Sequence, residues 1–228
     1  MSSFVKIEGR ILEGIFLEKV NRFLVLVKVD EVILLSFLPN PGRMKELLIP
    51  GRRVVLAEAK KEDRKTDYDL IGVKLPNQIV SLDSRIPNRI VLQALKDKEL
   101  KEFSKYDYIR PEYSFGHTRF DFFLRNKDEE CFLEVKSCTL VREGIALFPD
   151  AVTARGKRHV EDLIKAKKEG YRTSILFIVQ RQDASVFSPN YNTDPDFGRA
   201  LKEGKERGLE VYAYQSYFHK VEFFLEKK

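Results

Sequence analysis

Three charged residues stand inside two apolar segments near the middle of the chain. Asp121 lies within residues 120–124, and Glu134 and Lys136 lie within residues 131–136. An ionised carboxylate among Phe, Leu and Val is costly unless it is paired or bound to a metal. Two clustered carboxylates suit Mg²⁺ or Mn²⁺, which can activate a water against a phosphate while the lysine orients that water. The pattern therefore predicts hydrolysis of a phosphodiester.

Strand geometry determines how these residues are placed. Segments 118–124 and 131–140 have the composition of strands and are joined by a short charged hairpin. Residues two apart in a strand face the same side, so Glu134 and Lys136 project together. An antiparallel hairpin then brings Asp121 close to Glu134. In the structural alternative, Asp121 and Lys136 form a cross-strand ion pair and Glu134 lies at a solvated sheet edge.

The region that carries these residues alternates between helices and strands. Asn88 is a suitable N-cap for its first helix, and Gly170 is a natural end for its second. The expected helices are 88–103, 153–169 and 196–208, and the expected strands are 108–115, 118–124, 131–140, 174–180 and 209–214. This order predicts an α/β domain over residues 84–228, with a mixed sheet flanked by helices.

Residues 1–83 have a different pattern, typical of a small all-β barrel. The expected strands are 11–16, 23–29, 31–37, 53–58 and 68–73, with a short helix at 44–49. That helix lies between two turns, Asn40-Pro41-Gly42 and Pro50-Gly51. Five strands and one helix favour a barrel of the OB type, which often carries single-stranded nucleic acid. Another small barrel fits the spacing equally well.

Basic residues in both domains are candidates for binding nucleic acid. Arg155, Lys157 and Arg158 open the helix after the lysine-bearing strand, where a helix N-terminus also favours anions. A solvated first turn is the alternative, and the neighbouring His159 is more often structural than catalytic. In the barrel the candidates are Arg22, Asn40, Arg43 and Lys45, and the adjacent ring of Phe23 fits a core position equally well.

Composition narrows the class of protein. The chain has 228 residues with 41 Lys+Arg and 35 Asp+Glu, a net charge of +6 that permits a nucleic-acid partner without requiring one. Its apolar runs are far shorter than the ~20 residues that span a bilayer, and its first residues do not form a signal peptide. Its 2 cysteines cannot build a disulfide framework or a four-ligand zinc site. We therefore expect a cytoplasmic protein without a membrane partner.

Four longer motifs resemble those of the sugar fermentation stimulation protein A (SfsA) family. They cover residues 40–51, 119–122, 134–140 and 148–156, in the family's order, and the resemblance extends over nearly the whole chain. It implies an N-terminal OB-like domain and a C-terminal domain similar to PD-(D/E)XK nucleases. It also implies binding of DNA, single- or double-stranded, largely without sequence preference, and a regulatory role in sugar metabolism, particularly that of maltose.

The same resemblance implies roles for individual residues. Asp121, Glu134 and Lys136 match the nuclease signature, although Phe120 stands where a proline commonly precedes the aspartate. Arg119, in the same motif, joins the residues expected to bind DNA. Related nucleases often act as dimers, so a homodimer is a further expectation from the resemblance.

A third acid for the metal site is also expected from the family. Glu112, on the preceding strand, falls where the family places an acid and could complete a three-carboxylate site for Mg²⁺ or Mn²⁺. An edge-strand surface charge is the alternative for Glu112. Some nucleases of this kind instead take the acid from the first helix, which here would be Glu99 or Glu102.

Overall fold

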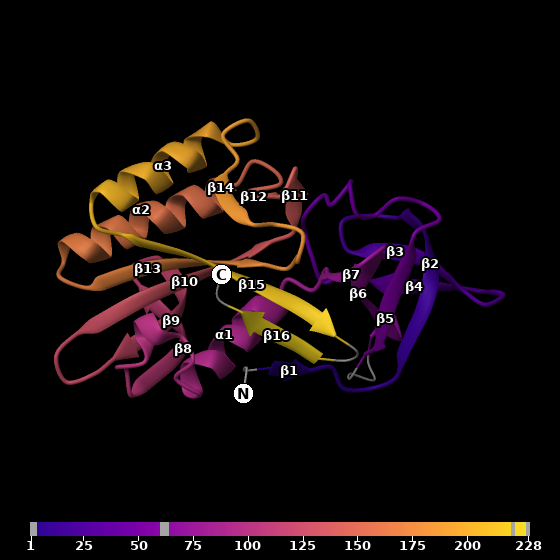
Figure 1. The fold of residues 1–228 in the computed structure, drawn as a ribbon, viewed down its shortest axis with the longest axis horizontal. Helices are drawn as coiled ribbons and strands as arrows, with labels where there is room; N and C mark the ends of the chain where they lie inside the picture. The colour runs from indigo at the N-terminus through magenta and orange to yellow at the C-terminus, as the bar shows by residue number, and fades with distance from the viewer. Residues whose placement is uncertain (1–3, 60–63, 220–221, 227–228) are drawn as a thin grey trace.

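The computed structural model describes residues 4–59, 64–219 and 222–226, which form two parts joined near residue 84 (Figure 1). The smaller part is an all-β barrel, and the larger is a mixed sheet with helices on both faces. None of the helices in these ranges is long and apolar enough to cross a membrane.

Six strands build the barrel in the order β4-β3-β2-β5-β6-β7. Their bounds are β2 (Ile11–Lys19), β3 (Leu24–Val29), β4 (Val32–Phe37), β5 (Arg53–Glu58), β6 (Tyr68–Leu75) and β7 (Gln78–Ser81). A parallel pairing of Phe37 with Asp69 also brings β4 to β6 and closes the barrel. Alternate residues point inward, so Val25, Val27 and Leu56 are fully buried in one core. The predicted all-β barrel is confirmed.

The loop between β4 and β5 differs from the sequence expectation. The helix predicted at 44–49 is wrong: a single turn forms, in which the Leu47 and Leu48 amides donate to the Met44 carbonyl at 3.0 and 2.9 Å. Pro50 disfavours helical backbone at the residue before it, and Met44 has a left-handed φ of 45°. Met44 and Leu47 are buried in the barrel core instead.

Seven strands form the sheet of the larger part, in the order β1-β16-β15-β13-β10-β9-β8. Their bounds are β1 (Phe4–Lys6), β8 (Tyr108–Phe115), β9 (Thr118–Arg125), β10 (Glu130–Cys138), β13 (Arg172–Val179), β15 (Glu210–His219) and β16 (Glu222–Glu226). The central strands β10, β13 and β15 are parallel, and the outer strands are antiparallel. Because β1 pairs with β16, the start of the described chain joins this sheet and not the barrel.

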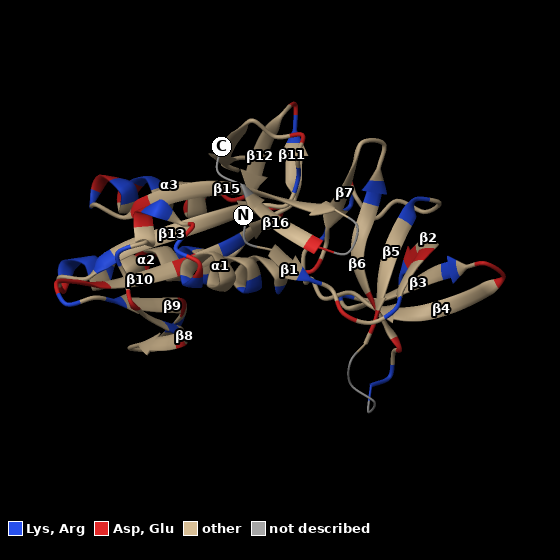
Figure 2. Cartoon of the chain, turned by 60° about the horizontal axis from the view of Figure 1, so that its bottom comes forward, with Lys and Arg blue, Asp and Glu red and all other residues tan. Residues whose placement is uncertain are grey.

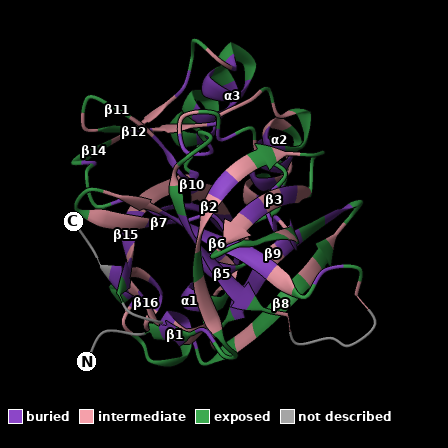
Figure 3. Ribbon diagram, turned by 90° about the vertical axis from the view of Figure 1, so that its right-hand side faces the viewer, coloured by how far each residue is buried: buried purple, intermediate pink, exposed green. Residues whose placement is uncertain are grey.

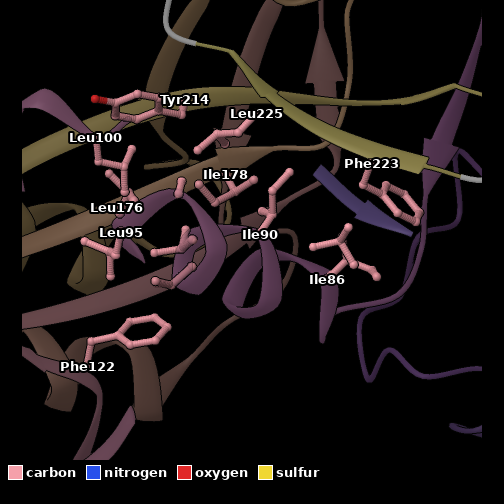
Figure 4. Close-up of a cluster of buried hydrophobic side chains, with 14 of the residues drawn as sticks. Ile86, Ile90, Leu95, Leu100, Phe122, Leu176, Ile178, Tyr214, Phe223 and Leu225 are labelled. Carbon is pink, nitrogen blue, oxygen red and sulfur yellow. The ribbon is translucent and has the colours of Figure 1, made fainter. Parts of the chain in front are cut away.

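Helices cover both faces of this sheet. One face carries α1 (Ile86–Lys96), and the other carries α2 (Ala154–Lys168) and α3 (Pro195–Glu206). Figure 4 shows Ile86, Ile90 and Leu95 of α1 packed among strand residues such as Leu176 and Ile178. The outer sides of α2 and α3 are exposed and carry many charged residues (Figures 2 and 3). The predicted α/β class with a mixed sheet is confirmed.

Two local expectations for this part are corrected. The first helix does not span 88–103: it ends at Lys96, Lys98 adopts a left-handed φ of 57°, and a separate 3₁₀ turn η1 (Lys101–Phe103) follows. Pro87 occupies its first turn, where a missing amide hydrogen is no loss, so Asn88 lies inside the helix and does not cap it. A small sheet that was not predicted contains β11 (Leu140–Arg142), β12 (Ile145–Phe148) and β14 (Val186–Pro189).

Candidate metal and phosphate site

Asp121 is fixed between a strand and a helix. The antiparallel pairing of β9 with β10 ends one residue before Asp121 and Glu134, so their backbones lie next to each other. The two carboxylates are close enough for the charge of Glu134 to affect Asp121. Asp121 Oδ2 accepts a hydrogen bond from the Val135 amide at 2.7 Å, and Oδ1 accepts one from the side-chain amide of Asn88 at 2.6 Å. The carboxylate is therefore held against β10 by a backbone group and against α1 by a side chain.

Glu134 lies almost completely buried on the side of β10 that faces α2, with only 2% of the residue exposed. Its Oε1 accepts hydrogen bonds from Lys136 Nζ at 2.5 Å and from His159 Nδ1. Its Oε2 is shielded from solvent, and no described residue gives it a hydrogen bond. A buried polar atom without a partner costs about 1–3 kcal/mol, and more when it is charged. The hydrogen-bonding capacity of Oε2 is therefore unused among the described residues.

The charges of the site influence one another. Burial and the nearby carboxylate of Glu134 raise the pKa of Asp121 to about 7. Burial would also raise the pKa of Glu134, but Lys136 and His159 outweigh that effect and hold it below its ordinary value. When both acids ionise beside one ammonium group, one negative charge is left in excess. A divalent cation would compensate this charge.

His159 and Arg155 extend this network along α2. The two residues are four apart and so lie on one face of the helix. Arg155 Nε donates to His159 Nε2 at 3.2 Å, which leaves the ring proton on Nδ1 to donate to Glu134. The start of α2 is fixed by Thr153, whose hydroxyl accepts a hydrogen bond from the Gly156 amide at 3.0 Å. The buried His159 ring therefore positions the Glu134 carboxylate.

Two residues of this site were not predicted. The sequence suggests a cap role for Asn88 and an ordinary structural role for His159, yet each holds one of the two acids. For His159 a signal existed: it follows Arg155 by one helical turn, on the helix that comes after the strand with Lys136. For Asn88 no local pattern could show the contact, because its partner lies 33 residues away in the chain.

Glu112 lies on the edge strand β8, where the register with β9 places it across from Asp121. Its side chain is 54% exposed and forms an ion pair with Arg119 Nε at 2.6 Å. Among the described residues, no group of three or more His, Cys, Asp or Glu side chains is arranged to hold a metal ion. Glu112 thus forms the surface ion pair that was its alternative, and its part in a three-carboxylate site stays a prediction. The first-helix alternative Glu102 instead accepts a hydrogen bond from the Tyr214 hydroxyl at 2.5 Å.

Both parts of the chain match known family models. Residues 17–82 match the model described as the SfsA N-terminal OB domain, and residues 85–222 match the one described as the sugar fermentation stimulation protein RE domain. The chain belongs to the sugar fermentation stimulation protein (SfsA) family. The OB type predicted for the barrel is thereby confirmed.

Individual members of the SfsA family are similar to this chain over most of its length. A sugar fermentation stimulation protein homolog of Caldanaerobacter subterraneus subsp. tengcongensis is 42% identical over 208 residues, which cover 91% of each chain. A homolog of Alkaliphilus metalliredigens is 44% identical over 212 residues, covering 92% of this chain and 91% of the other. The solved structure of Pyrococcus furiosus SfsA in complex with Ca²⁺ matches with a TM-score of 0.90 at 31% identity, covering 99% of this chain and 96% of that one.

The basic residues at the start of α2 of this SfsA-family chain differ in their exposure and in their ion pairs. Arg155 and Arg158 are exposed, and Arg155 contacts His159, the partner of Glu134. Lys157 is directed toward Glu161 and Asp196, at 3.8 and 3.7 Å, and so contributes to the contact between α2 and α3. Arg155 and Arg158 are therefore better placed than Lys157 to meet an anion near the site.

The barrel loop of the SfsA-family motif contacts the larger part. Asn40 is buried, donates to the Leu82 carbonyl at 2.9 Å and accepts from the Gly42 amide at 2.8 Å. It therefore shapes the loop, and its assignment as a nucleic-acid contact stays a prediction. The next amide, of Arg43, donates to Asp150 Oδ2 at 3.1 Å, just ahead of α2. The side chains of Arg43, Lys45 and Arg22 are exposed and remain candidates.

Proposed function

We propose that this SfsA-family protein binds DNA and hydrolyses its phosphodiester bonds with Mg²⁺ or Mn²⁺ held by Asp121 and Glu134. The observation that carries this proposal is the buried Oε2 of Glu134, which has no hydrogen-bond partner among the described residues and lies on the strand next to Asp121. A protein gains little from keeping such an oxygen unpaired unless a ligand completes it.

The residues present fit such an ion. Mg²⁺ keeps several waters and is usually bound by one or two carboxylates together with substrate phosphates, so two acids are enough. The Ca²⁺ complex of the P. furiosus relative supports a site for a hard divalent cation in this family. When bound, the ion would lower the pKa of a coordinated water and neutralise charge on the phosphate.

The side chains around the acids have distinct parts in this reaction. Lys136 is only 14% exposed and close to Glu134, so its ammonium group can orient the attacking water or a phosphate oxygen. His159 and Asn88 keep the two carboxylates in place. Exposed Arg158 at the start of α2 can bind a neighbouring phosphate, helped by the helix N-terminus.

A cleavage assay with two acidic variants tests the proposal. End-labelled single strands, duplexes, flaps and junctions are incubated with Mg²⁺ or Mn²⁺, and with EDTA as the metal-free reference. We expect cleavage by the natural protein and a loss of at least about 10²-fold for Asp121→Ala. Asp107→Asn is the matched control, because this acid is 78% exposed and pairs with Lys98, and it should cleave normally. If the natural protein leaves every substrate intact, the hydrolytic proposal fails.

Binding without cleavage is the second candidate function. It is favoured by the absence of a third acid beside Asp121 and Glu134 among the described residues. The protein would then bind DNA through phosphates, largely without sequence preference, and would influence genes of sugar metabolism, such as those for maltose. Affinity should fall steeply with salt, because neutralised phosphates release counterions. Binding that ignores salt and prefers one sequence would exclude this candidate.

A further inference from the structure

A hollow lies on the barrel, separate from the acids. It is a cleft of about 910 Å³, within the range of small-molecule sites, and neither Asp121, Glu134 nor Lys136 lines it. The cleft is bounded by the β3–β4 side of the barrel, by β6 and by the start of α1. The lining residues that matter for its chemistry are Phe23, Phe37, Arg64, Asp69, Asp83 and Arg85.

One wall of the cleft is aromatic. The rings of Phe23 and Phe37 stack, with their centroids 6.0 Å apart and their planes 18° from parallel. The guanidinium of Arg22 lies 5.3 Å from the Phe23 centroid, and that of Arg64 lies 5.0 Å from the Phe37 centroid. Phe23 is 40% exposed, so this ring is not a core residue. Aromatic rings and guanidinium planes side by side are the surfaces on which unpaired bases stack.

Charged side chains of the cleft form ion pairs with one another, and the positive and negative charges that line it are equal in number. Arg85 donates from Nε and Nη2 to the buried Asp83 at 2.8 and 2.6 Å, and from Nη2 to the buried Asp69 at 2.7 Å. Arg64 Nη2 donates to the other oxygen of Asp69 at 2.6 Å. The cationic residues that line the cleft are matched in number by acidic ones. A site without surplus positive charge suits an uncharged planar heterocycle better than a phosphate.

We propose that this cleft binds unpaired bases of single-stranded DNA, which stack on the Phe23–Phe37 wall while their phosphates remain outside. The inference rests on the DNA binding proposed above and narrows it to a single-stranded region. In a duplex the faces of the bases are stacked on one another, so they cannot enter. The start of α1 connects the two sites: Arg85 lines the cleft just before this helix, and Asn88 in its first turn holds Asp121.

Binding measured with three DNA probes tests this proposal. Fluorescence anisotropy in EDTA, which prevents cleavage, compares a short mixed-sequence strand, an abasic strand of the same length, and the duplex. We expect the intact strand to bind more tightly than the abasic strand and the duplex. Phe23→Ala should weaken binding of the intact strand by about 5- to 150-fold, the range for losing one base–aromatic stack, and should not affect the abasic strand.

Tyr108→Ala is the matched control for this variant. Tyr108 is also 40% exposed and has a guanidinium, that of Arg125, 4.7 Å from its ring centroid, but it lies on β8 away from the cleft. It should leave all affinities unchanged. The natural protein alone also tests the proposal. If it binds the intact and abasic strands equally well, the base-binding proposal is overturned and phosphate binding is left intact. Failure of the natural protein to bind any probe would instead overturn DNA binding itself.

Discussion

Replacing Asp121 with asparagine should stabilise the metal-free protein at alkaline pH. Burial and the charge of Glu134 raise the pKa of Asp121 to about 7, whereas an aspartate in an unfolded chain titrates near ~3.9. A gap of about 3 pH units corresponds to about 4 kcal/mol. The pKa of Asp121 is higher in the folded protein than in the unfolded chain, so its protonated form stabilises the fold relative to its ionised form. This stabilisation is fully present below about pH 4 and is lost as the pH rises through 7.

Asp121→Asn removes that loss because the amide has no charge to bury. It can still accept the hydrogen bond of the Val135 amide, and the side chain of Asn88 can rotate to accept one in return. Urea unfolding in EDTA should therefore show the variant to be more stable than the natural protein at about pH 8, by up to about 4 kcal/mol, with little difference near pH 4. Added Mg²⁺ should stabilise the natural protein and leave the variant unaffected.

Asp107→Asn is the matched control for this experiment. Asp107 is 78% exposed and pairs only with Lys98 in the described ranges, so its removal should change stability by less than about 0.5 kcal/mol at either pH. If Asp121→Asn is less stable than the natural protein at alkaline pH in EDTA, the two carboxylates do not repel each other as the geometry requires. The reasoning for a cation between them would then be refuted.

Three further predictions concern other contacts. His159→Gln should weaken Mn²⁺ binding, measured by calorimetry, about 10- to 100-fold because Glu134 loses its orienting partner, and unchanged affinity would contradict that role. Gly42→Ala would place a Cβ 2.8 Å from Asp150 Oδ2 and should cost about 1–3 kcal/mol in urea unfolding, whereas an unchanged midpoint would show that the loop can move away. Burial raises the pKa of Cys131 and Cys138 to about 12, so a thiol reagent should label them only after unfolding. Rapid labelling of the native protein would disprove their burial.

The sequence predicted the parts of this fold that depend on local patterns. The β9–β10 hairpin has apolar strands around a charged turn, and alternation alone places Glu134 and Lys136 on one side. The small sheet was missed because β12 pairs with β14 some 40 residues later in the chain, and neither strand has more than 4 residues. The contact of Asn88 with Asp121 was missed for the same reason, since a hydrogen bond between distant segments leaves no periodic signal.

The junction between the two parts connects the barrel to both helices that hold the acids. From the barrel side, the Arg43 amide bonds to Asp150, which precedes the helix that carries His159. From the other side, the start of α1 sends Arg85 to the barrel carboxylate of Asp69, at 2.7 Å, within three residues of Asn88. Each of these two connections therefore leads to a helix that holds one of the two acids. If the barrel binds a DNA strand and the acids cleave it, as proposed above, these contacts would set the position of the strand relative to the acids, and we expect cleavage at a constant spacing from the bound bases.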